Sequence, residues 1–145
     1  MNIRSVLVVC MGNICRSPMA EYLLRAALPE STQVSSAGLG ALINYPADDH
    51  AIALMRQHGM ELSAHRARQI SASLVAENDL ILVMTQRQKE QLEAQFPSAR
   101  GRVFRYGHWL NADVADPYQQ DRAAFEAAYA LISEATPLWV AKLIQ

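Results

Sequence analysis

The sequence of 145 residues contains only two cysteines, Cys10 and Cys15, and this scarcity excludes two classes of protein. A small secreted domain held together by disulfides normally carries more cysteines. A zinc site built on these thiols would need further Cys or His ligands close by, and none completes a set. We therefore expect no metal and no cofactor. Both cysteines lie on one short stretch, VVCMGNICRSP, beside Arg16.

Long apolar runs and an excess of basic charge are also missing. No apolar run approaches the ~20 residues that a membrane span needs, and the one after Arg4 is too short for the core of a signal peptide. The net charge of −1 lacks the basic footprint of a nucleic-acid binder. We expect one cytoplasmic domain over residues 1–145, monomeric, with no nucleic-acid partner and no direct insertion into a membrane.

The apolar pattern predicts strands and helices in alternation. Strands are expected at residues 5–10, 32–38, 80–84 and 102–107. Helices are expected at 17–28 (capped by Ser17), 48–59, 86–96 and 119–144 (bent or split by Pro137). This order predicts an α/β fold of three layers, in which a four-stranded parallel sheet is flanked by helices on both faces. Ligands bind such sheets at the carboxyl ends of the strands, where the cysteine stretch begins.

Residues 10–17 combine groups that suit the binding and attack of a phosphate. The five residues between Cys10 and Arg16 can curl so that their N–H groups face inward above a helix N-terminus, with Gly12 and Asn13 tolerating unusual conformations. Arg16 adds a planar guanidinium that matches phosphate oxygens. These groups favour the thiolate of Cys10, which is the nucleophilic form, and the Ser17 hydroxyl can donate to its sulfur.

Each of these residues also has a plainer interpretation. A lone cysteine that closes an apolar strand is usually a small buried hydrophobe, and a lone Arg16 is usually a surface charge. A nucleotide-binding P-loop is excluded, because the sequence has no G-x-x-x-x-G-K-[ST] motif. The combination of strand, Cys-x5-Arg-Ser and helix is far more specific than any one of its members.

The stretch VCMGNICRSPMAE resembles the signature loop of low-molecular-weight protein-tyrosine phosphatases, V-C-x-G-N-x-C-R-S-P. The resemblance implies that Cys10 is the nucleophile, that Arg16 binds phosphate, and that Asn13 and Ser17 shape the loop. It also implies a reversible disulfide between the two cysteines. Taken alone, the second cysteine is a small residue that fills space behind the loop. The remaining residues of the implied phosphate-binding loop are Met11, Gly12, Ile14 and Cys15.

Release of a phenolate from a tyrosyl phosphate needs an acid, and the loop contains none. The candidates are Asp113 and Asp116 in NADVADPYQQD. An Asp before Pro is by itself most often a turn residue. However, DPY matches the family motif D-P-[YW], so the resemblance assigns Asp116 as the acid and Tyr118 as an aromatic wall of the pocket. Asp113 lacks this context and is expected to face solvent. The implied reaction passes through a cysteinyl-phosphate, which water activated by Asp116 then hydrolyses.

The resemblance covers nearly the whole chain. By it, Ser36 in VSSAG and His65 in HRARQIS support the loop, although alone they would be a strand-end hydroxyl and part of a solvated basic run. Leu39, Leu42 and Ile43 would form an apolar rim for the substrate. The plainer interpretation of these three is a loop folded onto the core.

The segments SAGLGALI, RARQIS, YGHWL and ADPYQQ are similar to bacterial members that partner the tyrosine autokinases of exopolysaccharide or capsule export. The resemblance implies a phosphotyrosine protein as substrate, the tail of such a membrane kinase. One departure is Thr85, where relatives commonly have an acidic residue that can shape the pocket rim. Two alternatives stay open: an arsenate reductase, which needs further cysteines as a thiol relay, and a phosphate-binding or phosphocysteine carrier without turnover, which needs no acid such as Asp116.

Overall fold

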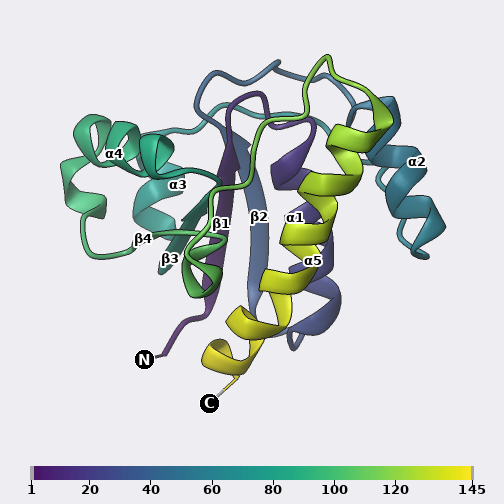
Figure 1. The fold of residues 1–145 in the computed structure, drawn as a ribbon. Helices are drawn as coiled ribbons and strands as arrows, with labels where there is room; N and C mark the ends of the chain where they lie inside the picture. Colours follow the sequence, from purple (N-terminus) through teal and green to yellow (C-terminus); the bar gives the residue numbers. More distant parts are fainter. Residues whose placement is uncertain (1, 145) are drawn as a thin grey trace.

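The computed structural model describes residues 2–144, which form a parallel sheet with helices on both sides (Figure 1). The strands are β1 (Ser5–Cys10), β2 (Gln33–Gly38), β3 (Leu80–Val83) and β4 (Val103–Arg105). The helices are α1 (Arg16–Ala27), α2 (Asp49–Gln57), α3 (Ala72–Glu77), α4 (Gln86–Gln95) and α5 (Arg122–Leu143), with short 3-10 turns at Pro97–Ala99 and His108–Leu110. All strand pairs are parallel, in the order β2-β1-β3-β4, which confirms the predicted fold class.

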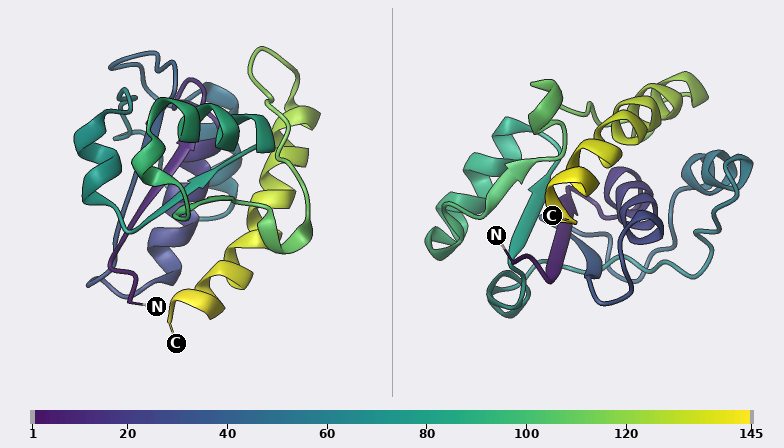
Figure 2. Two further views of the ribbon diagram at one scale, coloured as in Figure 1. Left: turned by 90° about the vertical axis from the view of Figure 1, so that its left-hand side faces the viewer. Right: turned by 90° about the horizontal axis from the view of Figure 1, so that it is seen from below.

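Alternate side chains of the central strand β1 pack into two separate cores. Val6, Val8 and Cys10 pack in the cluster formed with α1, α2 and α5. Leu7 and Val9 pack in the cluster formed with α3 and α4. The right-hand view of Figure 2 shows these two groups of helices on opposite faces of the sheet. A strand covered on both faces is apolar at nearly every position, which explains the unbroken run VLVVC.

One local prediction is wrong, one is wrong in part, and one helix was not predicted. Helix α1 begins at Arg16 and no side chain caps it, so Ser17 lies inside its first turn instead of capping it. Helix α5 runs through Pro137 without a split, since Ile132 and Trp139 on either side of the proline are buried in one core. Helix α3 has only six residues and was not predicted; Ser71 caps it. Within residues 2–144, no helix combines the length and apolarity needed to cross a bilayer.

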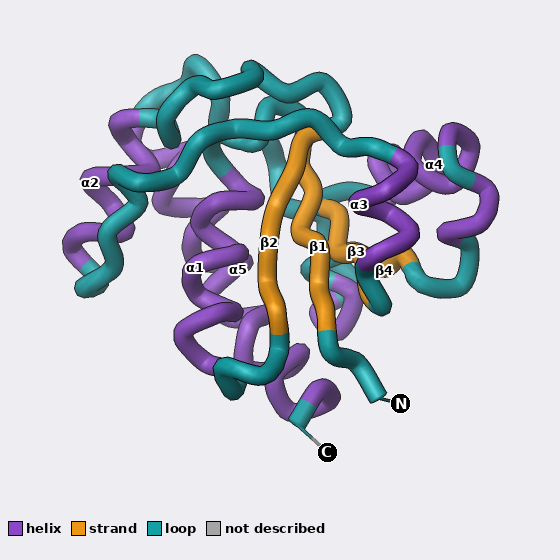
Figure 3. Tube along the Cα trace, turned by 180° about the vertical axis from the view of Figure 1, so that it is seen from behind, coloured by secondary structure: helices purple, strands orange, loops and turns teal. Residues whose placement is uncertain are grey.

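The carboxyl ends of the strands carry the loops that build the site. Figure 3 shows these loops crossing above the upper ends of β1 and β2. The segment after β2 is bonded to the segment before α3, with Asn44 N donating to the carbonyl of Ala67 at 2.8 Å and Ile70 N to that of Gly38 at 2.9 Å. The loop after β1 is therefore surrounded by a second layer of backbone that holds it in shape.

Candidate active site

The loop between Cys10 and Arg16 turns its carbonyl oxygens outward. The segment after β2 binds four of them through backbone N–H groups: Leu39 donates to Cys10, Gly40 to Met11, Leu42 to Gly12 and Asp48 to Ile14, at N···O distances of 2.8–3.1 Å. In a planar trans peptide the N–H points opposite to the C=O. Outward carbonyls therefore direct the following N–H groups toward the centre of the loop, which makes a concave site for an anion.

Asn13 forms the bend of this loop and is fully buried. Its φ of 61° is left-handed, a conformation that Asn tolerates better than most residues. Its Oδ1 accepts from the N–H of Arg68 at 2.9 Å, and its Nδ2 donates to Ser17 Oγ at 2.7 Å and to Ser36 Oγ at 3.0 Å. His65 Nε2 donates to its carbonyl at 2.6 Å. The structure thus brings Ser36 and His65 together behind the loop.

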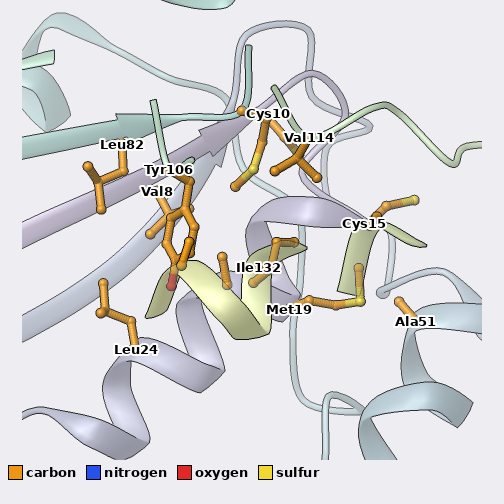
Figure 4. Packing of buried hydrophobic residues seen from close by; sticks show 14 of the residues in the cluster. Val8, Cys10, Cys15, Met19, Leu24, Ala51, Leu82, Tyr106, Val114 and Ile132 are labelled. Atoms are coloured by element: carbon orange, nitrogen blue, oxygen red, sulfur yellow. The ribbon is translucent and has the colours of Figure 1, made fainter. Parts of the chain in front are cut away.

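The two cysteines occupy unlike environments. Cys10 ends β1 at the base of the loop, 2 % exposed, with its Sγ 2.9 Å from Ser17 Oγ. Cys15 lies in the same apolar cluster (Figure 4), where burial and then the nearby charge of Asp48 raise the pKa of its thiol. Cys15 therefore stays protonated and is no ready nucleophile. Both thiols are free, and the reversible disulfide between them stays a prediction.

Arg16 is buried beside the loop, with 2 % of its surface exposed. Its Nη1 donates to the carbonyl of Val114 at 2.8 Å, and its Nη2 lies 3.5 Å from Asp116 Oδ2. Its Nε is buried and has no hydrogen-bond partner among the described residues. A buried donor without a partner is unfavourable, and an oxyanion in the loop would accept from it. The Asp116 carboxyl is half-exposed at the mouth of the site, and its Oδ1 accepts from Tyr118 N at 3.0 Å.

One pocket joins these groups. The residues that line it are Cys10, Met11, Gly12, Ile14, Cys15, Arg16, Gly40, Leu42, Asp116 and Tyr118. The thiol and the guanidinium of one loop and a carboxyl about a hundred residues later in the sequence thus face one small cavity. The arrangement suits a tetrahedral anion bound to the loop, with an apolar group attached to that anion and lying between Leu42 and Tyr118.

Sequence comparison agrees with this geometry. The family model for low molecular weight phosphotyrosine protein phosphatases matches residues 5–145. The chain belongs to this family. It is 51 % identical over 141 residues to the probable low molecular weight protein-tyrosine-phosphatase EpsP of Ralstonia solanacearum, with 97 % of each chain covered. The predicted enzyme class, a protein-tyrosine phosphatase, is thereby confirmed.

Solved structures show the same fold. The tyrosine phosphatase Wzb from Escherichia coli K30, in complex with sulphate, has a TM-score of 0.93 and 42 % identity, covering 97 % of this chain and 99 % of its own. Vibrio vulnificus Wzb in complex with benzylphosphonate has a TM-score of 0.94 and 41 % identity, covering 98 % and 100 %. The YwlE arginine phosphatase from Geobacillus stearothermophilus has a TM-score of 0.90 and 30 % identity, covering 96 % and 92 %.

The apolar rim of this phosphatase differs from the prediction. Leu39 is only 8 % exposed and packs with Ile70 and Val75 in the core against α3, so its assignment to the rim is wrong and the plainer interpretation holds. Ile43 is exposed but does not line the pocket. Leu42 does line it, together with Gly40, which sequence reasoning missed because a glycine carries no side-chain signal.

The side chains of Asp113 and Thr85 both bind N–H groups at the N-terminus of α4, outside the pocket of the phosphatase. Asp113 Oδ1 accepts from the N–H of Gln86 and forms an ion pair with Arg105, each at 3.0 Å. Thr85 caps α4 by accepting from the N–H of Gln88 at 3.1 Å. The departure from the family at Thr85 is therefore a helix cap, and Thr85 does not line the pocket.

The glycine that the loop of the phosphatase requires is Gly38, not Gly12. A Cβ on Gly38 would lie 2.5 Å from the carbonyl oxygen of Met11, which leaves no room for a side chain. A Cβ on Gly12 would meet Ile14 and Leu42 at 3.7 and 3.8 Å, which is ordinary contact. The loop thus does not depend on the missing side chain of Gly12. The close approach is between Gly38, at the end of β2, and the backbone of Met11.

Proposed function

We propose that the protein hydrolyses phosphotyrosine through a phosphate ester of Cys10. The observation that carries this proposal is the position of the Cys10 thiol under inward N–H groups, beside a guanidinium whose buried Nε lacks a partner. The Cys10 thiolate attacks phosphorus and the tyrosyl oxygen leaves with a proton from Asp116. Arg16 and the N–H groups hold the other three oxygens as their charge redistributes. Water activated by Asp116 then breaks the S–P bond and releases phosphate.

The two alternatives fit this site less well. A thiol relay to reduce arsenate would need cysteines beyond the two that the chain contains. A carrier without turnover would need no acid near the leaving group, yet Asp116 lies at the mouth of the pocket, 3.5 Å from the Nη2 of Arg16. After giving its proton to the leaving group, the partly exposed carboxylate can take a proton from the attacking water in the second step.

Asp116→Asn tests the assignment of the acid through its dependence on the leaving group. An amide cannot supply the proton, so we expect kcat/KM, which reports the first phosphoryl transfer, to fall about 10²-fold on phenyl phosphate, whose phenolate is a poor leaving group. On an aryl phosphate with a strongly acidic phenol the loss should be only a few-fold. The measurement is kcat/KM across a series of aryl phosphates for both enzymes.

Asp113→Asn is the matched control for that experiment. It lies three residues earlier in the same segment but outside the pocket, in an ion pair with Arg105. We expect its activity to follow the wild-type dependence on the leaving group. An equal loss on all substrates in Asp116→Asn, or a leaving-group effect in Asp113→Asn instead, would contradict the assignment of Asp116.

Phosphoarginine is a second candidate substrate, because an arginine phosphatase shares the fold. Its guanidinium carries several N–H donors that need acceptors when buried. Beside the loop, however, the pocket presents the side chains of Met11, Ile14, Leu42 and Tyr118, with Asp116 as the one carboxyl. Apolar walls suit the ring of a tyrosine better. The benzylphosphonate complex of a relative is of the same aromatic kind.

We therefore expect phosphotyrosine to be preferred over phosphoarginine. One peptide sequence synthesised with either residue allows kcat/KM to be compared directly, by release of inorganic phosphate. The ratio should favour phosphotyrosine at least about tenfold, because the unpaired donors of phosphoarginine weaken its binding. Equal values or the reverse order would contradict this specificity while leaving the cysteine chemistry intact.

The physiological substrate that we propose is the phosphorylated tail of a membrane tyrosine autokinase that controls exopolysaccharide or capsule production. The resemblance of SAGLGALI, RARQIS, YGHWL and ADPYQQ to the bacterial branch supports this choice. We also propose that the enzyme acts in the cytoplasm. Two free thiols close to each other in the sequence fit a reducing compartment.

A further inference from the structure

A chain of hydrogen bonds runs behind the loop from Cys10 to the surface of α1. Its links are Cys10 Sγ to Ser17 Oγ (2.9 Å), Ser17 Oγ to Asn13 Nδ2 (2.7 Å), Asn13 Nδ2 to Ser36 Oγ (3.0 Å), Ser36 Oγ to Glu21 Oε1, and Glu21 Oε2 to Arg25. The proposed mechanism uses only the end nearest the sulfur. Glu21 and Arg25, one turn apart on α1, have no part in it.

Two groups fix the direction of the hydrogen bonds around Asn13. The backbone N–H of Arg68 can only donate, so the side-chain oxygen of Asn13 must face it. The amide nitrogen then faces the other way and donates one proton to Ser17 and one to Ser36. At the far end the carboxylate of Glu21 can only accept, so the Ser36 hydroxyl donates to it.

This direction determines which atom donates at Cys10. Ser17 accepts from Asn13, so the single proton of its hydroxyl is left for the sulfur. A thiolate accepts such a bond far better than a thiol does, because the acceptor is charged. The chain therefore stabilises the nucleophilic form of Cys10, and Glu21 holds its far end in place by accepting from Ser36.

Arg25 holds Glu21 in position. Glu21 is buried, and a buried carboxylate needs a positive partner. The guanidinium of Arg25 pairs with it and also donates to the carbonyl of Val34 at 2.9 Å, which fixes its position at β2. Its side chain is 49 % exposed, so the ion pair links the surface of the protein to the buried chain.

We propose that the Arg25–Glu21 ion pair is a positioning device for the nucleophile, which orients Ser36, Asn13 and Ser17 in turn so that Cys10 receives a hydrogen bond. The inference rests on the proposed function, in which Cys10 attacks phosphorus. Neither member of the pair touches the substrate pocket. The other titratable and charged groups around the two ends of the chain are Tyr22, His65, Arg66 and Arg68 near Glu21, and Cys15, Arg16 and Asp116 near Cys10.

Arg25→Gln and Glu21→Leu together distinguish positioning from a simple effect of charge, because leucine leaves Ser36 without its acceptor. The readout is the rate at which iodoacetamide alkylates Cys10 as a function of pH, with peptide fragmentation to separate Cys10 from Cys15. Positioning predicts that both variants move the midpoint of this curve to higher pH, by about half to one unit for the loss of one such hydrogen bond. Charge alone predicts opposite shifts, because one variant removes a positive and the other a negative charge.

Matched variants complete this test. Arg56→Gln breaks the Arg56–Glu61 ion pair, which lies on the surface and away from the chain, and should leave the curve unmoved. Arg25→Lys keeps the positive charge and should restore most of the wild-type behaviour. Opposite shifts in Arg25→Gln and Glu21→Leu, or no shift in either, would overturn the inference. A lowered melting temperature with an unmoved curve would also overturn it, since the pair would then only stabilise the fold.

A double-mutant cycle provides a second test. Ser36→Ala breaks the chain at the next link, so it should shift the alkylation curve in the same direction as Glu21→Leu. In the double variant the shift should not exceed that of the larger single one, because both act through one path. Additive shifts would overturn the inference. Alkylation needs no turnover, so a wild-type enzyme without phosphatase activity would contradict the proposed function separately.

Discussion

Replacing Cys10 by serine should abolish hydrolysis of para-nitrophenyl phosphate, with a fall in kcat of about 10⁴-fold or more, as expected for loss of a nucleophile. Serine is nearly isosteric and can keep a hydrogen bond to Ser17, so the loop should retain its shape. Its hydroxyl remains protonated at any pH where the protein is folded, and its hydrogen-bond partner, Ser17, is not a base. The rate should therefore stay low from pH 5 to pH 8.

Cys10→Ser should still bind substrate, so that its loss of activity reports the missing nucleophile and not a damaged pocket. The inward N–H groups and Arg16 remain, so the variant should still bind a phosphotyrosine peptide, as measured by calorimetry, with an unchanged melting temperature. Cys15→Ser is the matched comparison, since the Cys15 thiol is protonated and the proposed mechanism does not use it. We expect the activity of Cys15→Ser to remain at least about 100-fold higher than that of Cys10→Ser. Comparable losses in both would contradict the unequal roles of the two thiols.

Much of the fold could be predicted because its signals are local. The run VLVVC is apolar at each position, which is characteristic of a strand covered on both faces, and β1 is such a strand. The six-residue helix α3 has too few residues for a periodic signal, and it was missed. Pro137 predicts a break when only the sequence is considered, but packing on both sides of it keeps α5 in one piece.

The site was harder to predict wherever two loops meet. The approach of Gly38 to the carbonyl of Met11 depends on how β2 ends beside β1, and nothing in VSSAG reveals that distance. Leu39 and Leu42 are both leucines on one loop, yet one enters the core and the other lines the pocket. The link from Ser36 to Glu21 joins a strand to a helix and is likewise invisible without the fold.

Replacing Arg16 by lysine should lower kcat/KM about 10³-fold, as expected for loss of an arginine that binds the transferred phosphoryl group. Lysine keeps the positive charge but not the planar set of donors, so it cannot offer two parallel N–H groups to one phosphate. In Arg16 the Nε is free while Nη1 holds the carbonyl of Val114. An ammonium group cannot serve both purposes. Inhibition by inorganic phosphate should weaken in parallel, and this readout is independent of turnover.

Lysine is more informative than alanine at this position because the segment with Asp116 must stay in place. Val114 is also anchored by its N–H to the carbonyl of Met84 at 2.9 Å, so this segment has a second attachment when the guanidinium is lost. Arg105→Lys is the matched control, since Arg105 pairs with Asp113 outside the pocket. It should change kcat/KM by less than about threefold, in the range of a surface ion pair. A fully active Arg16→Lys would mean that charge alone binds the phosphate, and the role given to the unpaired Nε would then be wrong.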